Sequence, residues 1–311
     1  MASRPSVPPP SGFPPDEEHS FATASDGTRL FVRTRGLERA GHPEDTPTAF
    51  FCDGILCDGF IWKYLYDEVA NLLRLTHWHY RGHGRSGAPG DPDRLDIPAH
   101  AADLKTVRDH VSDPPCVILG HSMGTQVALE EVHRYPDKVR GLVLICGSYG
   151  KVTQSFRGMP ILDFILPKLM DIVEKQPDLV RALWSRIPPE VALKLALRAR
   201  DVDPDKVHAD DLIPYLRHMT HVDFPMFLKM LRAAGEHTAE DYLAAIKVPV
   251  LIIAGERDTF TPAGLSEHMA EVIPNAELLM VKGGSHVAPI EQPALINERV
   301  TAFIREKVLA H

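Results

Sequence analysis

A serine between two glycines lies where an apolar run gives way to a helix-forming segment. Residues 117–119 are Val-Ile-Leu, as in a buried strand, and residues 120–124 read Gly-His-Ser-Met-Gly. A Gly-x-Ser-x-Gly pattern between a strand and a helix is typical of a nucleophile elbow. So sharp a turn strains the serine backbone, and the flanking positions have room for hydrogen only. The pattern predicts an exposed Ser122 hydroxyl that can act as a nucleophile.

Attack on an acyl carbon creates a negatively charged oxygen, and the N–H group that follows the serine is a candidate to bind it. We expect Met123 to begin a helix. Unpaired N–H groups and the positive end of the helix dipole favour an anion at that position. The elbow therefore predicts both a nucleophile and one oxyanion donor.

A serine hydroxyl is a weak nucleophile at neutral pH, so it needs a base that titrates near pH 7, and histidine is that side chain. His286 follows the last predicted strand after a glycine pair that lets the loop turn back. Asp258 follows the preceding strand. It would hold the imidazole tautomer and stabilise the imidazolium. Glu256 is the nearest rival for the acid.

Strand-like and helical patterns alternate along most of the chain. A predicted hairpin around Asp26-Gly27 precedes apolar runs at residues 48–52, 75–80, 117–119, 141–146, 248–254 and 277–281. Helical patterns cover about residues 62–73, 99–111 and 293–308. Strands that are apolar throughout and separated by helices imply parallel pairing with helices on both faces. The sequence therefore predicts an α/β fold.

The alternation stops between residues 148 and 243, where only helical patterns broken by prolines occur. This segment is rich in Met and aromatic residues, including Met159, Phe164 and Met226. An all-helical insertion between two strands of a parallel sheet suggests a lid whose apolar side chains line a pocket. Plain core packing is the alternative for each such residue. Contact of residues 161–173 with a membrane surface is the weaker interpretation, because prolines and acidic residues interrupt this segment.

The composition is ordinary for a globular protein, with 44% hydrophobic and 24% charged residues among 311. The net charge of −8 argues against nucleic acid or an anionic membrane as the main partner. Residues 1–18 hold six prolines and no apolar core, so we expect a disordered tail rather than a signal peptide. No run approaches the roughly 18 apolar residues of a membrane span. We expect a cytoplasmic protein; the sequence does not indicate its oligomeric state.

The cysteines and histidines give no convincing metal site. The four cysteines are too few for a disulfide scaffold, and most lie in apolar runs that favour buried thiols. His77 and His79 share one face of a predicted strand, and His218 and His221 lie three apart on a predicted helix. Neither pair has a third ligand at a fitting spacing. We therefore expect no metal and no organic cofactor.

These motifs together resemble the α/β-hydrolase family over roughly residues 20–309. The resemblance rests on residues 120–124, on Gly-Glu-Arg-Asp at 255–258, on Gly-Ser-His at 284–286 and on Arg-Gly-His-Gly-Arg-Ser at 81–86. The order Ser122, Asp258, His286 is that of the family's triad. It implies a mostly parallel, eight-stranded sheet. The core would be residues 19–147 and 244–311, and the helical cap residues 148–243.

One position departs from the family pattern. The family usually has His-Gly after the early strand, with the second oxyanion N–H on the next residue, and this chain has Asp53-Gly54. Ile55 would supply that backbone donor. The Asp53 carboxylate could repel the oxyanion, or it could turn away and bind loop amides, which we favour.

The resemblance implies a serine hydrolase that cleaves a carboxylic ester of a small, largely apolar substrate through an acyl-enzyme. A lactonase, a cofactor-free perhydrolase or haloperoxidase, and a carbon–carbon bond hydrolase use the same chemistry and stay open. A serine at the elbow argues against the dehalogenase and epoxide hydrolase branches. A slow-turnover ligand receptor that retains the triad is the alternative from another class, and only Asp53 favours it.

Overall fold

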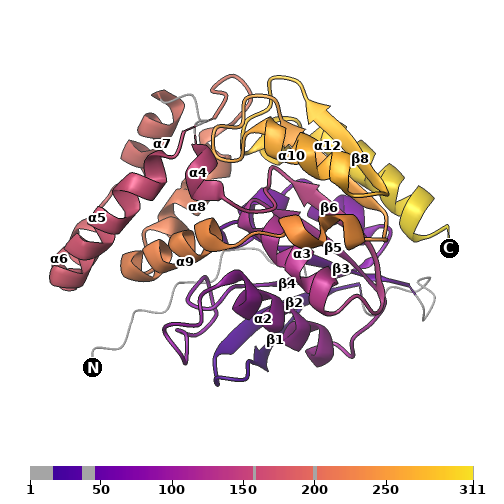
Figure 1. Cartoon of the computed structure of the whole chain (residues 1–311), viewed down its shortest axis with the longest axis horizontal. Coiled ribbons are helices and arrows are strands. Elements are labelled where there is room, and N and C mark those ends of the chain that lie inside the picture. The colour runs from indigo at the N-terminus through magenta and orange to yellow at the C-terminus, as the bar shows by residue number, and fades with distance from the viewer. Residues whose placement is uncertain (1–16, 37–45, 157–158, 199–201, 311) are drawn as a thin grey trace.

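The computed structural model describes residues 17–36, 46–156, 159–198 and 202–310. Within these residues eight strands form one sheet, and their bounds are β1 (Glu17–Thr23), β2 (Arg29–Arg35), β3 (Thr48–Cys52), β4 (Arg74–Trp78), β5 (Cys116–His121), β6 (Val139–Ile145), β7 (Val250–Gly255) and β8 (Ala276–Val281). Their spatial order is β1-β2-β4-β3-β5-β6-β7-β8 (Figure 1). β2 pairs antiparallel with β1 and β4, and all other pairs are parallel. The predicted mostly parallel, eight-stranded sheet is confirmed.

Helices connect the strands. Their bounds are η1 (Phe60–Trp62), α1 (Tyr66–Ala70), α2 (Ile97–His110), α3 (Met123–Arg134), α4 (Val152–Ser155), α5 (Ile161–Lys175), α6 (Pro177–Trp184), α7 (Pro189–Arg198), α8 (Ala209–Met219), α9 (Phe224–Glu236), η3 (Glu240–Ala245), α10 (Ala263–Val272), α11 (Ala288–Glu291), α12 (Pro293–Phe303) and η4 (Ile304–Val308).

Successive strand residues point to opposite faces of the sheet, and apolar residues on both faces are buried. In β3, Phe50 packs in a cluster with side chains of α2, α3 and α10. The next residue, Phe51, packs in a second cluster with α1 and α12. The central strand β5 repeats this division, with Ile118 in the first cluster and Leu119 in the second. Helices therefore cover both faces of the sheet, as predicted.

The start of the sheet differs from the prediction. β1 begins at Glu17, two residues inside the predicted disordered tail, and the rest of that tail lies outside the described residues. Glu17 pairs in register with Arg35, and Glu18 pairs with Thr34. The antiparallel ladder to β2 extends the strand into a segment whose charge and prolines suggested a tail.

The predicted helix at residues 62–73 also differs. The chain forms only the short turn η1 and the five-residue helix α1 there. The Trp62 indole donates a 2.6 Å hydrogen bond to Asp53, and β4 must begin by Arg74. The apolar periodicity of residues 62–73 overestimated the length of the helix.

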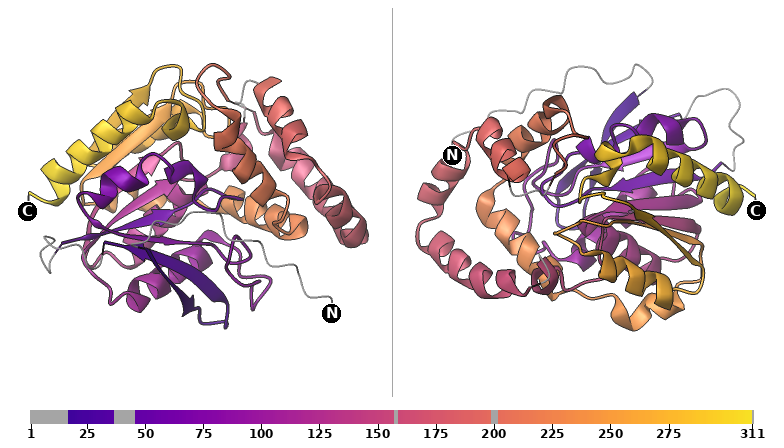
Figure 2. Two further views of the ribbon diagram at one scale, coloured as in Figure 1. Left: turned by 180° about the vertical axis from the view of Figure 1, so that it is seen from behind. Right: turned by 90° about the horizontal axis from the view of Figure 1, so that it is seen from above.

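The segment between β6 and β7 contains α4 to α9 and η3, and Figures 1 and 2 show α4 to α9 together at one side of the sheet. We call α4 to α9 the helical insertion. Gly150 and Thr238, at its two ends, form an isolated bridge. Glu130 of α3 accepts a 2.6 Å hydrogen bond from Tyr242 and lies 3.3 Å from His237. The exit of the insertion is therefore anchored to the helix that follows Ser122.

The apolar side chains of the insertion do not all face inward. Leu166 and Val173 of α5 pack against Leu228 of α9. Phe164 and Met159 are 70% and 51% exposed, so the alternative of plain core packing is wrong for these two residues. Within the described ranges, no helix is long and apolar enough to cross a membrane.

Candidate functional site

Ser122 occupies a strained turn between β5 and α3. Its backbone angles are φ 53° and ψ −121°, a region that side-chain-bearing residues rarely adopt. A Cβ at Gly120 would lie 2.3 Å from the Gly124 carbonyl oxygen, and one at Gly124 would lie 2.1 Å from the Cys52 carbonyl oxygen. Any side chain at either glycine would collide with main chain. Close packing within the elbow therefore requires Gly120, and close packing of the elbow against the end of β3 requires Gly124.

Asp258 and His286 come together at the carboxyl ends of the last two strands. The loop after β7 carries Asp258 and the loop after β8 carries His286, and Nδ1 of the imidazole lies 2.9 Å from Oδ2 of the carboxylate. Burial would raise the pKa of Asp258, but the charge and hydrogen bond of His286 and hydrogen bonds from Thr261 hold it below its usual value. An ionised Asp258 can only accept, so Nδ1 carries the proton and Nε2 is left as a proton acceptor.

Thr261 is a partner of Asp258 that our sequence reasoning missed. Its hydroxyl oxygen lies 2.8 Å from Asp258 Oδ2 and 2.8 Å from the Cys146 carbonyl oxygen. The N–H groups of Phe260 and Thr261 both donate to Asp258 Oδ1. Asp-x-x-Thr is the local signal for this arrangement, because an Asp side chain often binds the N–H groups two and three residues on. The carboxylate is thus fixed from both sides.

His121 links the elbow to the loop that carries His286. Its Nε2 donates to the His286 carbonyl oxygen at 2.9 Å, and the two ring centroids are 5.0 Å apart. Burial lowers the pKa of His121 to about 3, so this ring is neutral and holds one tautomer. Between the described residues Ser122 and His286, the structure gives no direct hydrogen bond. Such contacts are often long without substrate and tighten in the reacting complex.

The two predicted oxyanion donors lie on either side of Ser122. Met123 begins α3 directly after it. Ile55 lies in the loop after β3, residues 53–58, which we call the oxyanion loop. A Cβ at Gly54 would lie only 3.1 Å from the Ser122 Cβ, so this loop passes directly over the serine. In the described part of the chain, neither N–H has a hydrogen-bond acceptor, which leaves both open to a ligand oxygen.

Asp53 is bound by side chains, and our expectation that it binds loop amides is wrong. Its Oδ1 accepts from the Trp62 indole at 2.6 Å, and its Oδ2 lies 2.9 Å from His77 Nε2. Arg33 Nε donates to the other ring nitrogen of His77, so Nε2 carries the proton and donates to Asp53. Burial raises the pKa of Asp53 to about 7, against the Trp62 hydrogen bond and the Arg33 charge. Through these two contacts, one carboxylate oxygen of Asp53 faces η1 and the other faces β4.

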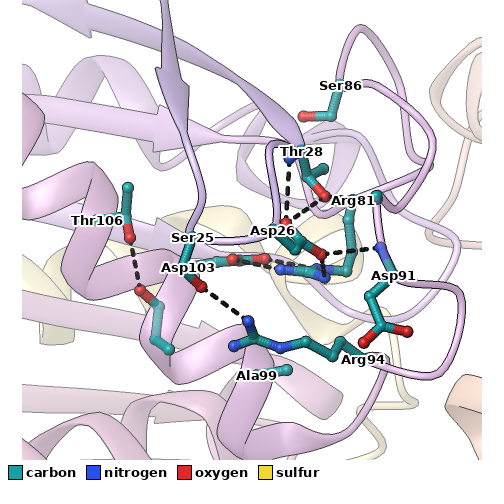
Figure 3. A network of polar contacts seen from close by, with 12 residues as sticks. Ser25, Asp26, Thr28, Arg81, Ser86, Asp91, Arg94, Ala99, Asp103 and Thr106 are labelled. Atoms are coloured by element: carbon teal, nitrogen blue, oxygen red, sulfur yellow. Dashed lines mark hydrogen bonds and ion pairs between the residues drawn. The ribbon is translucent and has the colours of Figure 1, made fainter.

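The loop after β4 is anchored by Arg81, the first residue of the Arg-Gly-His-Gly-Arg-Ser motif. Its guanidinium is fully buried and forms a two-pronged contact with Asp103 of α2, at 2.8 and 2.6 Å. A third hydrogen bond, of 2.7 Å, reaches Asp26 in the β1–β2 turn. Figure 3 shows Arg81 between these two carboxylates. These charge-assisted hydrogen bonds hold Arg81, and with it the start of the loop after β4, in one position.

The histidines that we considered as metal ligands take part in other contacts. His77 lies between Arg33 and Asp53, and His79 Nδ1 accepts a 2.9 Å hydrogen bond from the Arg85 N–H. Among the residues that the structure describes, no group of three or more His, Cys, Asp or Glu side chains is placed to hold a metal ion. All four cysteines are free and buried.

Comparison with known proteins identifies relatives over nearly the whole chain. A family model described as the alpha/beta hydrolase fold matches residues 74–293. A bifunctional esterase/perhydrolase, DCH, from Acinetobacter calcoaceticus is 28% identical over 306 residues, which cover 92% of this chain and 99% of the relative. An esterase structure from Exiguobacterium antarcticum superimposes with a TM-score of 0.70 at 19% identity, covering 93% of this chain and all of that one. An enol-lactonase structure from Burkholderia xenovorans superimposes with a TM-score of 0.67 at 21% identity, covering 92% of this chain and all of that one.

Proposed function

This chain belongs to the alpha/beta hydrolase fold family, and on that premise we propose that it is a serine hydrolase that cleaves a carboxylic ester of a small, largely apolar substrate. The observation that carries the proposal is the 2.9 Å contact between Asp258 and His286 at the same sheet edge as the strained Ser122. A histidine held in one tautomer by a buried carboxylate is the base that a serine nucleophile needs.

The proposed reaction proceeds through an acyl-enzyme. His286 Nε2 takes the Ser122 proton as Oγ attacks the carbonyl carbon, and the Met123 and Ile55 N–H groups bind the resulting oxyanion. The same imidazolium then protonates the departing alkoxide. Water, activated in turn by His286, hydrolyses the acyl-enzyme and restores Ser122. Each proton moves between Ser122, His286 and the reactants, so the cycle needs no added cofactor.

The surroundings of Ser122 support an apolar acyl group. Met123, next to the serine, and Leu56 of the oxyanion loop belong to the large apolar cluster on one face of the sheet, which also includes Val222, Met226 and Met230 from the insertion. Methionine side chains adapt to irregular ligands because they are unbranched and flexible. We assign residues 148–243 the role of a cap over the strand ends on the same grounds.

Perhydrolysis is a second candidate, because one relative at 28% identity is a bifunctional esterase/perhydrolase. The acyl-enzyme would then transfer its acyl group to hydrogen peroxide instead of water. The products are a peracid and the free serine. Attack by Ser122 and formation of the acyl-enzyme are the same in both reactions.

A series of p-nitrophenyl esters with two to twelve acyl carbons tests the proposal. We expect turnover of every member up to a preferred length, and a fall in kcat/KM beyond it because longer chains no longer fit the acyl site. Added hydrogen peroxide yields peracid if perhydrolysis operates. A folded protein that turns over no ester would refute the esterase function and favour the receptor alternative.

A further inference from the structure

The oxyanion loop contains a turn with a strained residue at its third position. The Cys57 N–H donates to the Gly54 carbonyl oxygen at 3.2 Å, which closes a four-residue turn over Ile55 and Leu56. Leu56 has φ +65°. Ile55, at the second position, is not among the positive-φ residues. A positive φ at the third position alone is the mark of a type II turn, where glycine or asparagine is usual. Leucine is strained there, so contacts with the surrounding structure must hold the turn in this form.

His83 makes one of these contacts. The Leu56 N–H donates to His83 Nε2 at 3.2 Å, and His83 Nδ1 lies 3.1 Å from the Arg81 carbonyl oxygen. A backbone N–H can only donate and a carbonyl can only accept, so Nε2 carries the lone pair and Nδ1 the proton. Burial lowers the pKa of His83 to about 4, which keeps the ring neutral at pH 7. The imidazole is therefore a fixed acceptor for this single peptide group.

That peptide group decides the type of the turn. Types I and II differ mainly in the orientation of the peptide between the second and third residues, which is here the Ile55–Leu56 peptide. In a type I turn Leu56 would have a negative φ and its strain would be relieved. The hydrogen bond to His83 opposes this flip. The flip would also change ψ of Ile55, the residue whose own N–H is the proposed oxyanion donor.

We propose that His83 is a positioning residue that holds the oxyanion loop in its type II form and so keeps the Ile55 N–H directed at the oxyanion. The ring is itself held in place, because Arg81, which supplies its carbonyl partner, is fixed by Asp26 and Asp103 (Figure 3). This inference rests on the proposed esterase function. His83, the histidine of the Arg-Gly-His-Gly-Arg-Ser motif, would then support catalysis by holding the oxyanion loop in place, and it would not contact the substrate.

The test compares two substitutions at one position. His83→Gln keeps an acceptor near the place of Nε2, whereas His83→Leu fills a similar volume without one. We expect His83→Leu to lower kcat for p-nitrophenyl butyrate by about 10- to 100-fold, since a misdirected oxyanion donor costs this much. KM should change less than about threefold, because the donor acts mainly on the transition state. His83→Gln should recover most of the loss.

Two further measurements separate positioning from a general loss of structure. A trifluoromethyl ketone adds to the serine and forms an oxyanion, so its inhibition constant should rise in His83→Leu by about the same factor as kcat falls. In a Leu56→Gly background, where positive φ carries no strain, His83→Leu should cost less than in the wild-type chain.

The outcomes distinguish this inference from the proposed function. If the wild-type protein hydrolyses the ester and His83→Leu leaves kcat and ketone binding unchanged, the positioning role is wrong and the esterase function stands. The positioning role is also wrong if His83→Gln and His83→Leu lose activity equally while both keep the wild-type melting temperature. If the wild-type protein turns over no ester, the proposed function fails first. The inhibition constants of the trifluoromethyl ketone for the wild-type protein and the two variants then still test the positioning role, which is wrong if they are equal.

Discussion

Ser122→Ala is expected to lower kcat for p-nitrophenyl butyrate by about 10⁵- to 10⁶-fold, because removal of a serine nucleophile leaves only oxyanion binding and substrate positioning. The substitution deletes one oxygen from a partly buried residue. The strained backbone at φ 53° remains, and alanine tolerates it about as well as serine. We therefore expect the melting temperature to change little. Steady-state kinetics and a thermal unfolding curve of the same preparation measure both quantities.

Residual activity above about one-tenth of the wild-type value would contradict this role for Ser122. A contaminating esterase would produce a similar signal, so wild-type and variant should be purified side by side from a host lacking its main esterases. A loss of activity accompanied by unfolding would be uninformative for serine chemistry, and the melting curve identifies that case directly.

Asp258→Asn is expected to lower kcat by about 10⁴-fold at pH 7 with little change in KM, because the amide imposes the wrong histidine tautomer. The geometry around Asp258 dictates which way the amide turns. Its Oδ1 accepts from the N–H groups of Phe260 and Thr261, so the amide oxygen must take that place. The NH₂ group then faces His286 Nδ1, which becomes an acceptor. The proton moves to Nε2, and His286 can no longer take a proton from Ser122.

Glu256→Gln is the matched control, since Glu256 is the rival acid two residues away. Its Oε2 accepts a 2.7 Å hydrogen bond from the Gly283 N–H and is exposed, and an amide oxygen can accept the same bond. We expect kcat within about twofold of wild type, as for most surface substitutions. The assignment of the acid to Asp258 is wrong if Glu256→Gln loses more activity than Asp258→Asn.

The parts of the fold and site that could be predicted depend on local pattern and on strand order. Gly-His-Ser-Met-Gly after an apolar run indicated a strand–turn–helix, and the structure has β5, Ser122 and α3 there. Parallel strands end at one edge of a sheet. Residues that follow β7 and β8 therefore had to lie near one another, as Asp258 and His286 do.

The contacts that organise the oxyanion loop could not be predicted in the same way. The Asp53–His77 contact joins residues 24 apart, and the Leu56–His83 hydrogen bond joins residues 27 apart. Both depend on how β3 and β4 pair and on the path of each loop beyond the sheet. Leucine has no preference for positive φ, so the sequence did not indicate the strained backbone at Leu56. The short α1 was missed because apolar periodicity does not report where tertiary contacts end a helix.

The central claim is that Ser122 forms a covalent intermediate, and labelling with a p-nitrophenyl alkylphosphonate tests it most directly. The reagent loses p-nitrophenol to a nucleophile and leaves a stable phosphonyl group. Intact mass spectrometry and peptide mapping should find one adduct per chain, on Ser122, formed in step with loss of esterase activity and absent from Ser122→Ala. Inactivation with the adduct on another residue, or ester turnover by a protein that the reagent neither labels nor inhibits, would contradict the claim.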